Sequence, residues 1–147
     1  MPITNSQNKS KKLAGIYIHI PFCKSRCKYC DFFSTTHLEK QSQYVQALLM
    51  EIQDRLPISN TQYPIANNPY PISTIYIGGG TPSTLQVGHL QTIVEAIRRE
   101  AKGDEAKGKE AKGKEAKGKE IEITLEANPG DITEEKVRAW REMGINR

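Results

Sequence analysis

The sequence lacks any run of about 18 apolar residues, so no segment is expected to span a membrane. Its first 12 residues, MPITNSQNKSKK, also lack the apolar stretch of a secretory signal. We therefore expect residues 1–12 to be a polar leader and the protein to be cytoplasmic. Cysteine is scarce, and three is an odd number that leaves one thiol over in any set of disulfides. Thiols stay reduced in the cytoplasm, so the three cysteines call for another explanation.

Acidic residues are missing from positions 9–28, although the whole chain carries a net charge of only +4. Six basic residues lie there: Lys9, Lys11, Lys12, Lys24, Arg26 and Lys28. Such a stretch can attract a nucleic acid. No aromatic-rich or helical recognition motif accompanies it, so we expect no nucleic-acid partner. A positive field around an anionic cluster or cofactor is the alternative interpretation.

Six segments have the apolar spacing of regular secondary structure. GIYIHI is short and β-branched, as in a buried strand, and IEITLEA alternates apolar and polar residues. Longer segments place apolar residues three and four positions apart, as in an amphipathic helix. The sequence predicts strands at 15–20, 75–77 and 121–127, which alternate with helices at 37–56, 85–99 and 133–143. This order predicts an α/β fold with parallel strands and right-handed crossovers.

Particular residues are expected to limit these elements. Pro57 should end the first helix, because proline cannot continue the hydrogen-bond ladder. The glycines at 78–80 should break the second strand. Thr133 should open the last helix, and Gly144 should end it.

The final residues, 145–147, lie where a fourth strand is expected. A (β/α) barrel needs many more residues than this chain has. We therefore expect this chain to be the front part of a larger protein. An incomplete sheet of this kind would expose a strand edge and an unpaired apolar face.

Two segments are expected to lie outside the core. Residues 57–72 contain four prolines and three asparagines, which predicts a loop. Residues 100–120 are four tandem pentads, EAKGD and three copies of EAKGK, closed by Glu120. They hold no aliphatic residue larger than alanine, which predicts a solvated low-complexity insert. A charged interaction arm is the alternative, but seven lysines against six acids would attract no polyion strongly.

All three cysteines lie in CKSRCKYC, at residues 23–30, with the spacing C-x3-C-x2-C. A structural zinc ion needs four protein ligands, so the fourth would have to be a histidine or a carboxylate. Candidates are His19, His37, His89 and Asp31, none of which has obvious ligand spacing. A [4Fe–4S] cluster usually takes four cysteines, so three would leave one iron open. An open iron can bind a small molecule that has both an amine and a carboxylate.

Three motifs together resemble a known family. "GIYIHIPFCKSRCKYCDF", "YIGGGTPS" and "LEANPGDIT" are similar to the N-terminal third of the radical S-adenosylmethionine family that contains oxygen-independent coproporphyrinogen III oxidase and the heme chaperone. The resemblance covers residues 15–57, 73–99 and 121–147. It implies that residues 13–147 are the N-terminal portion of a radical S-adenosylmethionine core domain, with three βα units of a partial (β/α) barrel. The segments at 57–72 and 100–120 would be insertions in it.

The resemblance also implies roles for individual residues. Cys23, Cys27 and Cys30 would bind a [4Fe–4S] cluster. S-adenosylmethionine would be contacted by a tyrosine, by the glycine-rich strand end and by an acid, namely Tyr17, Gly79, Gly80, Thr81 and Glu126. Tyr29 occupies an aromatic position that lies near a second cofactor molecule in the oxidase. The residues alone leave plainer roles open, since Tyr17 could be a strand aromatic, the glycines an ordinary turn and Glu126 a lone polar residue. His19 is expected to be a buried, hydrogen-bonded histidine.

Phe32 separates two branches of the family. The oxidase usually carries another cysteine at this position, so the sequence resembles the heme chaperone branch. That resemblance implies heme, a heme-acceptor protein and a reductant for the cluster as partners. The heme-binding residues would lie beyond residue 147, and oxidase activity is not expected in this branch or in so short a chain. The oxidase, which acts in porphyrin biosynthesis, and an inactive remnant or simple iron–sulfur module are the alternatives.

Overall fold

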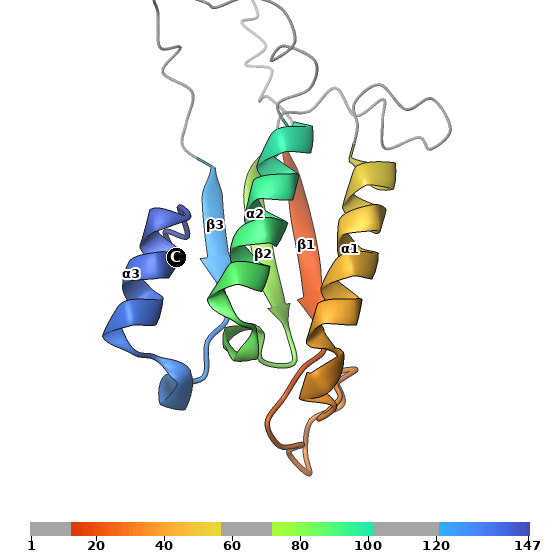
Figure 1. Cartoon of the computed structure of the whole chain (residues 1–147), viewed down its shortest axis with the longest axis vertical. Coiled ribbons are helices and arrows are strands. Elements are labelled where there is room, and N and C mark those ends of the chain that lie inside the picture. Colours follow the sequence, from red (N-terminus) through yellow and green to blue (C-terminus); the bar gives the residue numbers. More distant parts are fainter. Residues whose placement is uncertain (1–12, 57–71, 102–120) are drawn as a thin grey trace, which may run out of the picture.

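A computed structural model describes residues 13–56, 72–101 and 121–147 (Figure 1). The predicted polar leader lies outside the described residues. So do the predicted loop up to residue 71 and the pentad insert from residue 102 onward. In the described part of the chain, no helix is long and apolar enough to cross a membrane.

The fold is an α/β unit with three parallel strands in the order β1-β2-β3. Each strand is followed by a helix, so the predicted order and the predicted parallel pairing are both confirmed. Figure 1 shows α1 and α2 lying across one face of the sheet and α3 lying beside β3. The elements are β1 (Ala14–Ile20), α1 (Gln41–Arg55), β2 (Ile72–Gly79), α2 (Val87–Ala101), β3 (Glu122–Leu125) and α3 (Glu134–Glu142).

β2 is longer than the sequence predicts. The strand continues through Gly78 and Gly79, so the expectation that glycines break it after Ile77 is wrong. Parallel pairing accounts for the difference, because Gly78 lies opposite His19 and Gly79 opposite Ile20. The backbone of β1 therefore holds the two glycines in the sheet although glycine is a poor strand former.

The core lies between the sheet and the helices. Alternate strand residues point into it, including Ile20, Ile77 and Ile123, each fully buried. Leu90 and Ile93 of α2 pack in the same cluster. The predicted amphipathic helices thus cover a single face of the sheet with their apolar sides.

The opposite face of the sheet has no helix on it in Figure 1. Tyr17, Thr74 and Tyr76 are exposed there, with Glu126 just after β3. We call this surface the open face. Strand alternation places the aliphatic side chains toward the helices, so the exposed apolar surface of the open face is aromatic, with Tyr17 56% and Tyr76 41% exposed.

Capping residues set the limits of the last helix as predicted. The Thr133 side chain accepts a hydrogen bond from the Lys136 amide, which caps α3 at its beginning. Gly144 has a φ of +86°, a left-handed conformation that ends helices. At the first helix, a 3-10 turn at Leu38–Lys40 precedes α1.

The last residues lie along β3. The amides of Asn146 and Arg147 both donate to the Ile123 carbonyl over 3.1 Å. The Leu125 amide donates to the Arg147 carbonyl over 3.0 Å. This pairing occurs where the sequence predicts the start of a fourth strand.

Candidate functional site

The cysteine loop, residues 23–30, leaves the carboxyl end of β1 and is fixed at its base. The Cys23 amide donates to the Thr35 carbonyl over 2.9 Å, and the Thr35 amide donates to the Pro21 carbonyl over 2.7 Å. The three cysteines are free thiols, with Cys27 exposed and the others partly buried. Beyond Cys23 the side chains are exposed as far as Tyr29. The loop therefore has a rigid base and a solvent-exposed tip.

The structure brings most of the predicted site residues to one cavity. This cavity has a volume of about 180 Å³ and lies at the carboxyl ends of β1 and β2, where parallel α/β folds bind ligands. Six predicted residues line it: Cys23, Cys27, Tyr29, Cys30, Gly80 and Thr81.

The glycine-rich end of β2 fits closely against the cysteine loop. The Gly80 amide donates to the Ile20 carbonyl over 2.8 Å, and the Thr81 amide donates to the Phe22 carbonyl over 2.7 Å. A Cβ atom at Gly80 would lie 2.9 Å from both Cys23 Sγ and the Phe22 carbonyl oxygen. Thr81 Oγ1 donates to Cys23 Sγ over 3.5 Å. Gly80 and Thr81 thus pack directly against the first cysteine, which explains why position 80 needs a glycine.

Glu126 connects the glycine-rich strand end to the open face. One carboxylate oxygen accepts from the Gly79 amide over 3.0 Å, and the other accepts from the Tyr76 hydroxyl over 2.6 Å. This hydrogen bond to the carboxylate is the main cause that raises the pKa of Tyr76. Tyr17 stacks on Tyr76 with ring centroids 6.0 Å apart. Tyr17, Gly79 and Glu126 therefore form a second group of predicted residues beside the cavity.

Tyr29 is at the tip of the cysteine loop. Its side chain is 88% exposed, and a hydrogen bond with Cys27 is the main cause that raises the pKa of its hydroxyl. Phe32 and Phe33 follow it and are also exposed. Nothing buries Tyr29 among the described residues, so its aromatic ring is available to a bound molecule.

The donor set suits a cluster better than a single metal ion. Among the described residues, no three histidine, cysteine or acidic side chains are arranged to hold one ion. A cube presents a separate iron to each thiolate, so its ligands need not converge on one point. Three free thiols around one cavity, with a glycine where a side chain would intrude, fit a cluster.

The histidines that zinc would require make other contacts. His19 contacts the Phe33 carbonyl through Nε2 at 2.9 Å, and the Nδ1 atom of His37 pairs with Glu39 at the same distance. His89 contacts Ser42 through Nε2 at 3.3 Å. None of the three lines the cysteine cavity.

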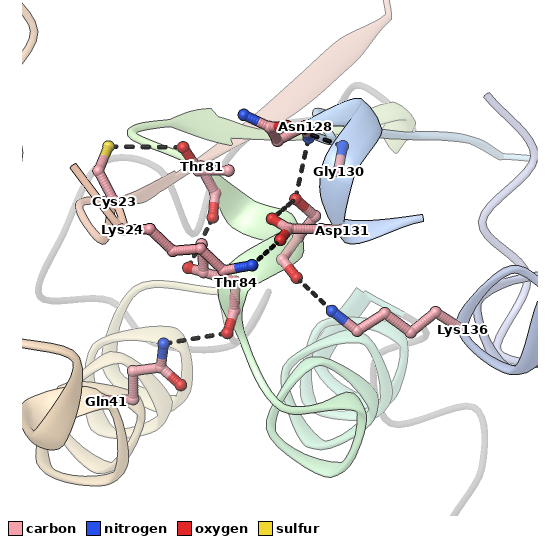
Figure 2. Close-up of polar contacts among 10 residues, drawn as sticks. Cys23, Lys24, Gln41, Thr81, Thr84, Asn128, Gly130, Asp131 and Lys136 are labelled. Atoms are coloured by element: carbon pink, nitrogen blue, oxygen red, sulfur yellow. Dashed lines mark hydrogen bonds and ion pairs between the residues drawn. The ribbon is translucent and has the colours of Figure 1, made fainter. Parts of the chain in front are cut away.

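One group at the site could not be identified from the sequence. Asp131 has only 3% of its side chain exposed and pairs with Lys24 of the cysteine loop (Figure 2). It also accepts from Ser83 Oγ over 2.8 Å. The hydrogen bond from Lys24 is the main cause that lowers the pKa of Asp131. These residues are 107 positions apart in the chain, so only the fold brings them together.

Comparison with known proteins agrees with this geometry. The family model described as the radical SAM superfamily matches residues 17–147. The heme chaperone HemW of Escherichia coli is 32% identical over 137 residues, which cover 90% of this chain and 30% of that protein. HemW of Bacillus subtilis is 34% identical over 137 residues, which cover 92% of this chain and 30% of that protein. The chain therefore spans about 30% of the length of these relatives.

A solved structure shows the same fold. Coproporphyrinogen III oxidase (HemN) from Escherichia coli, a radical SAM enzyme, superimposes with a TM-score of 0.68 at 24% identity. The match covers 95% of this chain and 28% of the oxidase, so the three strands and helices correspond to part of its (β/α) fold. The family match includes β2, β3, most of β1 and the whole cysteine loop. On this evidence, the chain belongs to the radical SAM superfamily.

Proposed function

We propose that this chain binds a [4Fe–4S] cluster through Cys23, Cys27 and Cys30 and binds S-adenosylmethionine at the iron that the cysteines leave open. One observation carries the proposal: three free thiols line one cavity together with Gly80 and Thr81 at the strand ends. Three ligands are one fewer than such a cluster usually takes from a protein.

The surrounding residues have distinct tasks in this proposal. When bound, the cluster and S-adenosylmethionine supply one-electron cleavage of a carbon–sulfur bond. The hydrogen bond from Thr81 to Cys23 Sγ would tune the electron density of that ligand. Gly79, Gly80 and Thr81 would allow the cofactor to approach the backbone, and the Glu126 carboxylate would attract its amino group. Tyr17 would offer an aromatic surface to S-adenosylmethionine, and Tyr29 to a second cofactor molecule.

We further propose a role in heme transfer. The relatives named HemW are heme chaperones, and Phe32 stands where the oxidase usually has a cysteine. By this proposal, the chain is the N-terminal portion of a cytoplasmic protein that passes heme to an acceptor protein and receives electrons from a separate reductant. The segments at 57–72 and 100–120 are then insertions in the core domain at 13–147.

Electron paramagnetic resonance of the reconstituted chain tests the cofactor proposal. The chain is loaded with iron and sulfide without oxygen, reduced, and measured with and without S-adenosylmethionine. A [4Fe–4S]⁺ signal that changes with the cofactor is the expected result, since the cofactor would bind the open iron. A cluster signal that ignores the cofactor would support a simple iron–sulfur module, and no cluster would refute the proposal altogether.

Glu126→Gln is expected to weaken S-adenosylmethionine binding about tenfold, because an amide replaces a charged acceptor and a charge-assisted hydrogen bond is lost. A titration of the spectral change with S-adenosylmethionine measures this effect. Tyr76→Phe is the matched control, since it removes the hydrogen bond to Glu126 but keeps the carboxylate. Unchanged affinity in Glu126→Gln would show that the carboxylate does not face the cofactor.

A further inference from the structure

Asp131 is a buried acid that lines the cysteine cavity but is not among the predicted cofactor contacts. It lies in a 3-10 turn, Pro129–Asp131, that follows β3. Its side chain is 3% exposed, whereas the side chain of its partner Lys24 is 65% exposed. A buried carboxylate is costly unless it is paired and hydrogen-bonded. Lys24 supplies the opposite charge and Ser83 a hydrogen bond, so the Asp131 carboxylate favours keeping Lys24 in contact with it.

Ser83 joins Asp131 to the polypeptide that follows β2. Its hydroxyl donates to Asp131 over 2.8 Å and accepts from the Asn128 amide over 3.0 Å. Its carbonyl accepts from Lys136 Nζ over 2.9 Å. Ser83 is itself 1% exposed. The acid therefore belongs to a buried polar network that is anchored in both the β2–α2 and the β3–α3 connections (Figure 2).

The network reaches the cysteine loop next to its first ligand. Lys24 follows Cys23 directly in the chain, and Cys23 Sγ accepts from Thr81 on the other side. Cys23 is thus held between two attachments to the rest of the fold. Beyond Lys24 the loop is exposed as far as Tyr29, so core packing cannot fix this part.

We propose that Asp131 is a positioning residue, which holds the cysteine loop through Lys24 so that its thiols are arranged before a cluster binds. This inference rests on the proposed cluster site. Partners that orient metal ligands commonly change metal affinity by about tenfold to a hundredfold when they are removed. Asp131 also lines the cysteine cavity, but in this proposal it acts through Lys24 rather than as a ligand.

The test compares Asp131→Asn, Lys24→Met and the double variant with the unmodified chain. Two readouts are used: hydrogen exchange of the Cys23 and Thr35 amides without cluster, and the rate at which a chelator removes iron from the reconstituted chain. We expect both single variants to exchange several-fold faster at the base of the loop and to lose iron about tenfold faster. The double variant should be affected no more than the more strongly affected single variant, because the two substitutions break the same contact.

Two further variants separate this role from a general loss of stability. Lys24→Arg keeps the charge and should stay close to the unmodified chain. Glu134→Gln removes an 85% exposed carboxylate from the neighbouring helix and should change neither readout. Amides of β2 report whether the fold itself is intact in each variant.

Unchanged loop exchange and iron loss in Asp131→Asn and Lys24→Met would overturn the inference, as would additive effects in the double variant. If the unmodified chain takes up no cluster, the proposed function fails, while the exchange of the loop still decides whether Asp131 holds it. If Asp131→Asn does not fold, Lys24→Met breaks the same contact from its exposed end.

Discussion

Cys27→Ser is expected to abolish formation of the cluster, with bound iron falling from about four atoms per chain to near zero. Two thiolates would remain, and an alcohol is a poor ligand for iron. Cys27 is the informative position because it is exposed, whereas Cys23 also packs against Gly80 and Thr81. Its substitution should leave the fold intact. Iron and sulfide analysis after reconstitution measures the loss, and the unfolding transition of the cluster-free chain checks the fold.

Ser25→Ala is the matched control for this substitution. Ser25 lies in the same loop and lines the same cavity, but hydroxyl side chains are not expected to bind the cluster. It should retain the iron content of the unmodified chain. If Cys27→Ser keeps its iron, or if Ser25→Ala loses as much, the thiol of Cys27 is not a ligand.

The alternation of strands and helices was predictable because its signals are local. Aliphatic residues two apart in the strands and three or four apart in the helices report the buried face of each element. The residues at which a strand ends were harder to predict where pairing with a neighbouring strand overrides local propensity. Gly78 and Gly79 have weak strand propensity, yet they remain in β2 because β1 supplies hydrogen-bonding partners at His19 and Ile20.

The candidate site was predictable to the extent that its chemistry is contiguous in the sequence. Three cysteines within eight residues, and the glycines after a strand, are recognisable without a structure. The Tyr17–Tyr76 stack depends instead on register, since the two residues are direct partners in parallel strands. Lys24 and Asp131 depend on the complete crossover arrangement, because three strands must be placed before the two side chains meet.

The open face of the sheet explains why the predicted cofactor contacts lie together. Apolar side chains are directed toward the helices, which leaves Tyr17, Tyr76 and Glu126 to form a polar and aromatic surface beside the cysteine cavity. Glu126 also receives a backbone hydrogen bond from Gly79. The end of β2 therefore contacts both Cys23, a proposed cluster ligand, and Glu126, a proposed cofactor contact, so a change there should affect both.

Gly80→Ala is expected to destabilise the chain by about 1–3 kcal/mol and to impair cluster uptake. The new Cβ would lie 2.9 Å from Cys23 Sγ, the Phe22 carbonyl oxygen and the Pro21 carbonyl carbon. Two of these neighbours are backbone atoms, so they can move away only if the base of the cysteine loop shifts. Denaturant unfolding of the cluster-free chain measures the loss of stability, and iron analysis measures the effect on the loop.

Gly88→Ala is the matched control, and it is not expected to destabilise the chain. Gly88 lies in α2, and nothing lies within 4 Å of the Cβ that alanine would add. Alanine is favoured over glycine by roughly 0.5–1 kcal/mol in the middle of a helix and by less in the first turn, so this variant should be as stable or slightly more stable and take up iron normally. If both substitutions had the same small effect, the close approach of Gly80 to Cys23 would not constrain the site. Opposite effects would show that the space beside Cys23, rather than glycine content in general, determines whether the loop can hold its thiols in place.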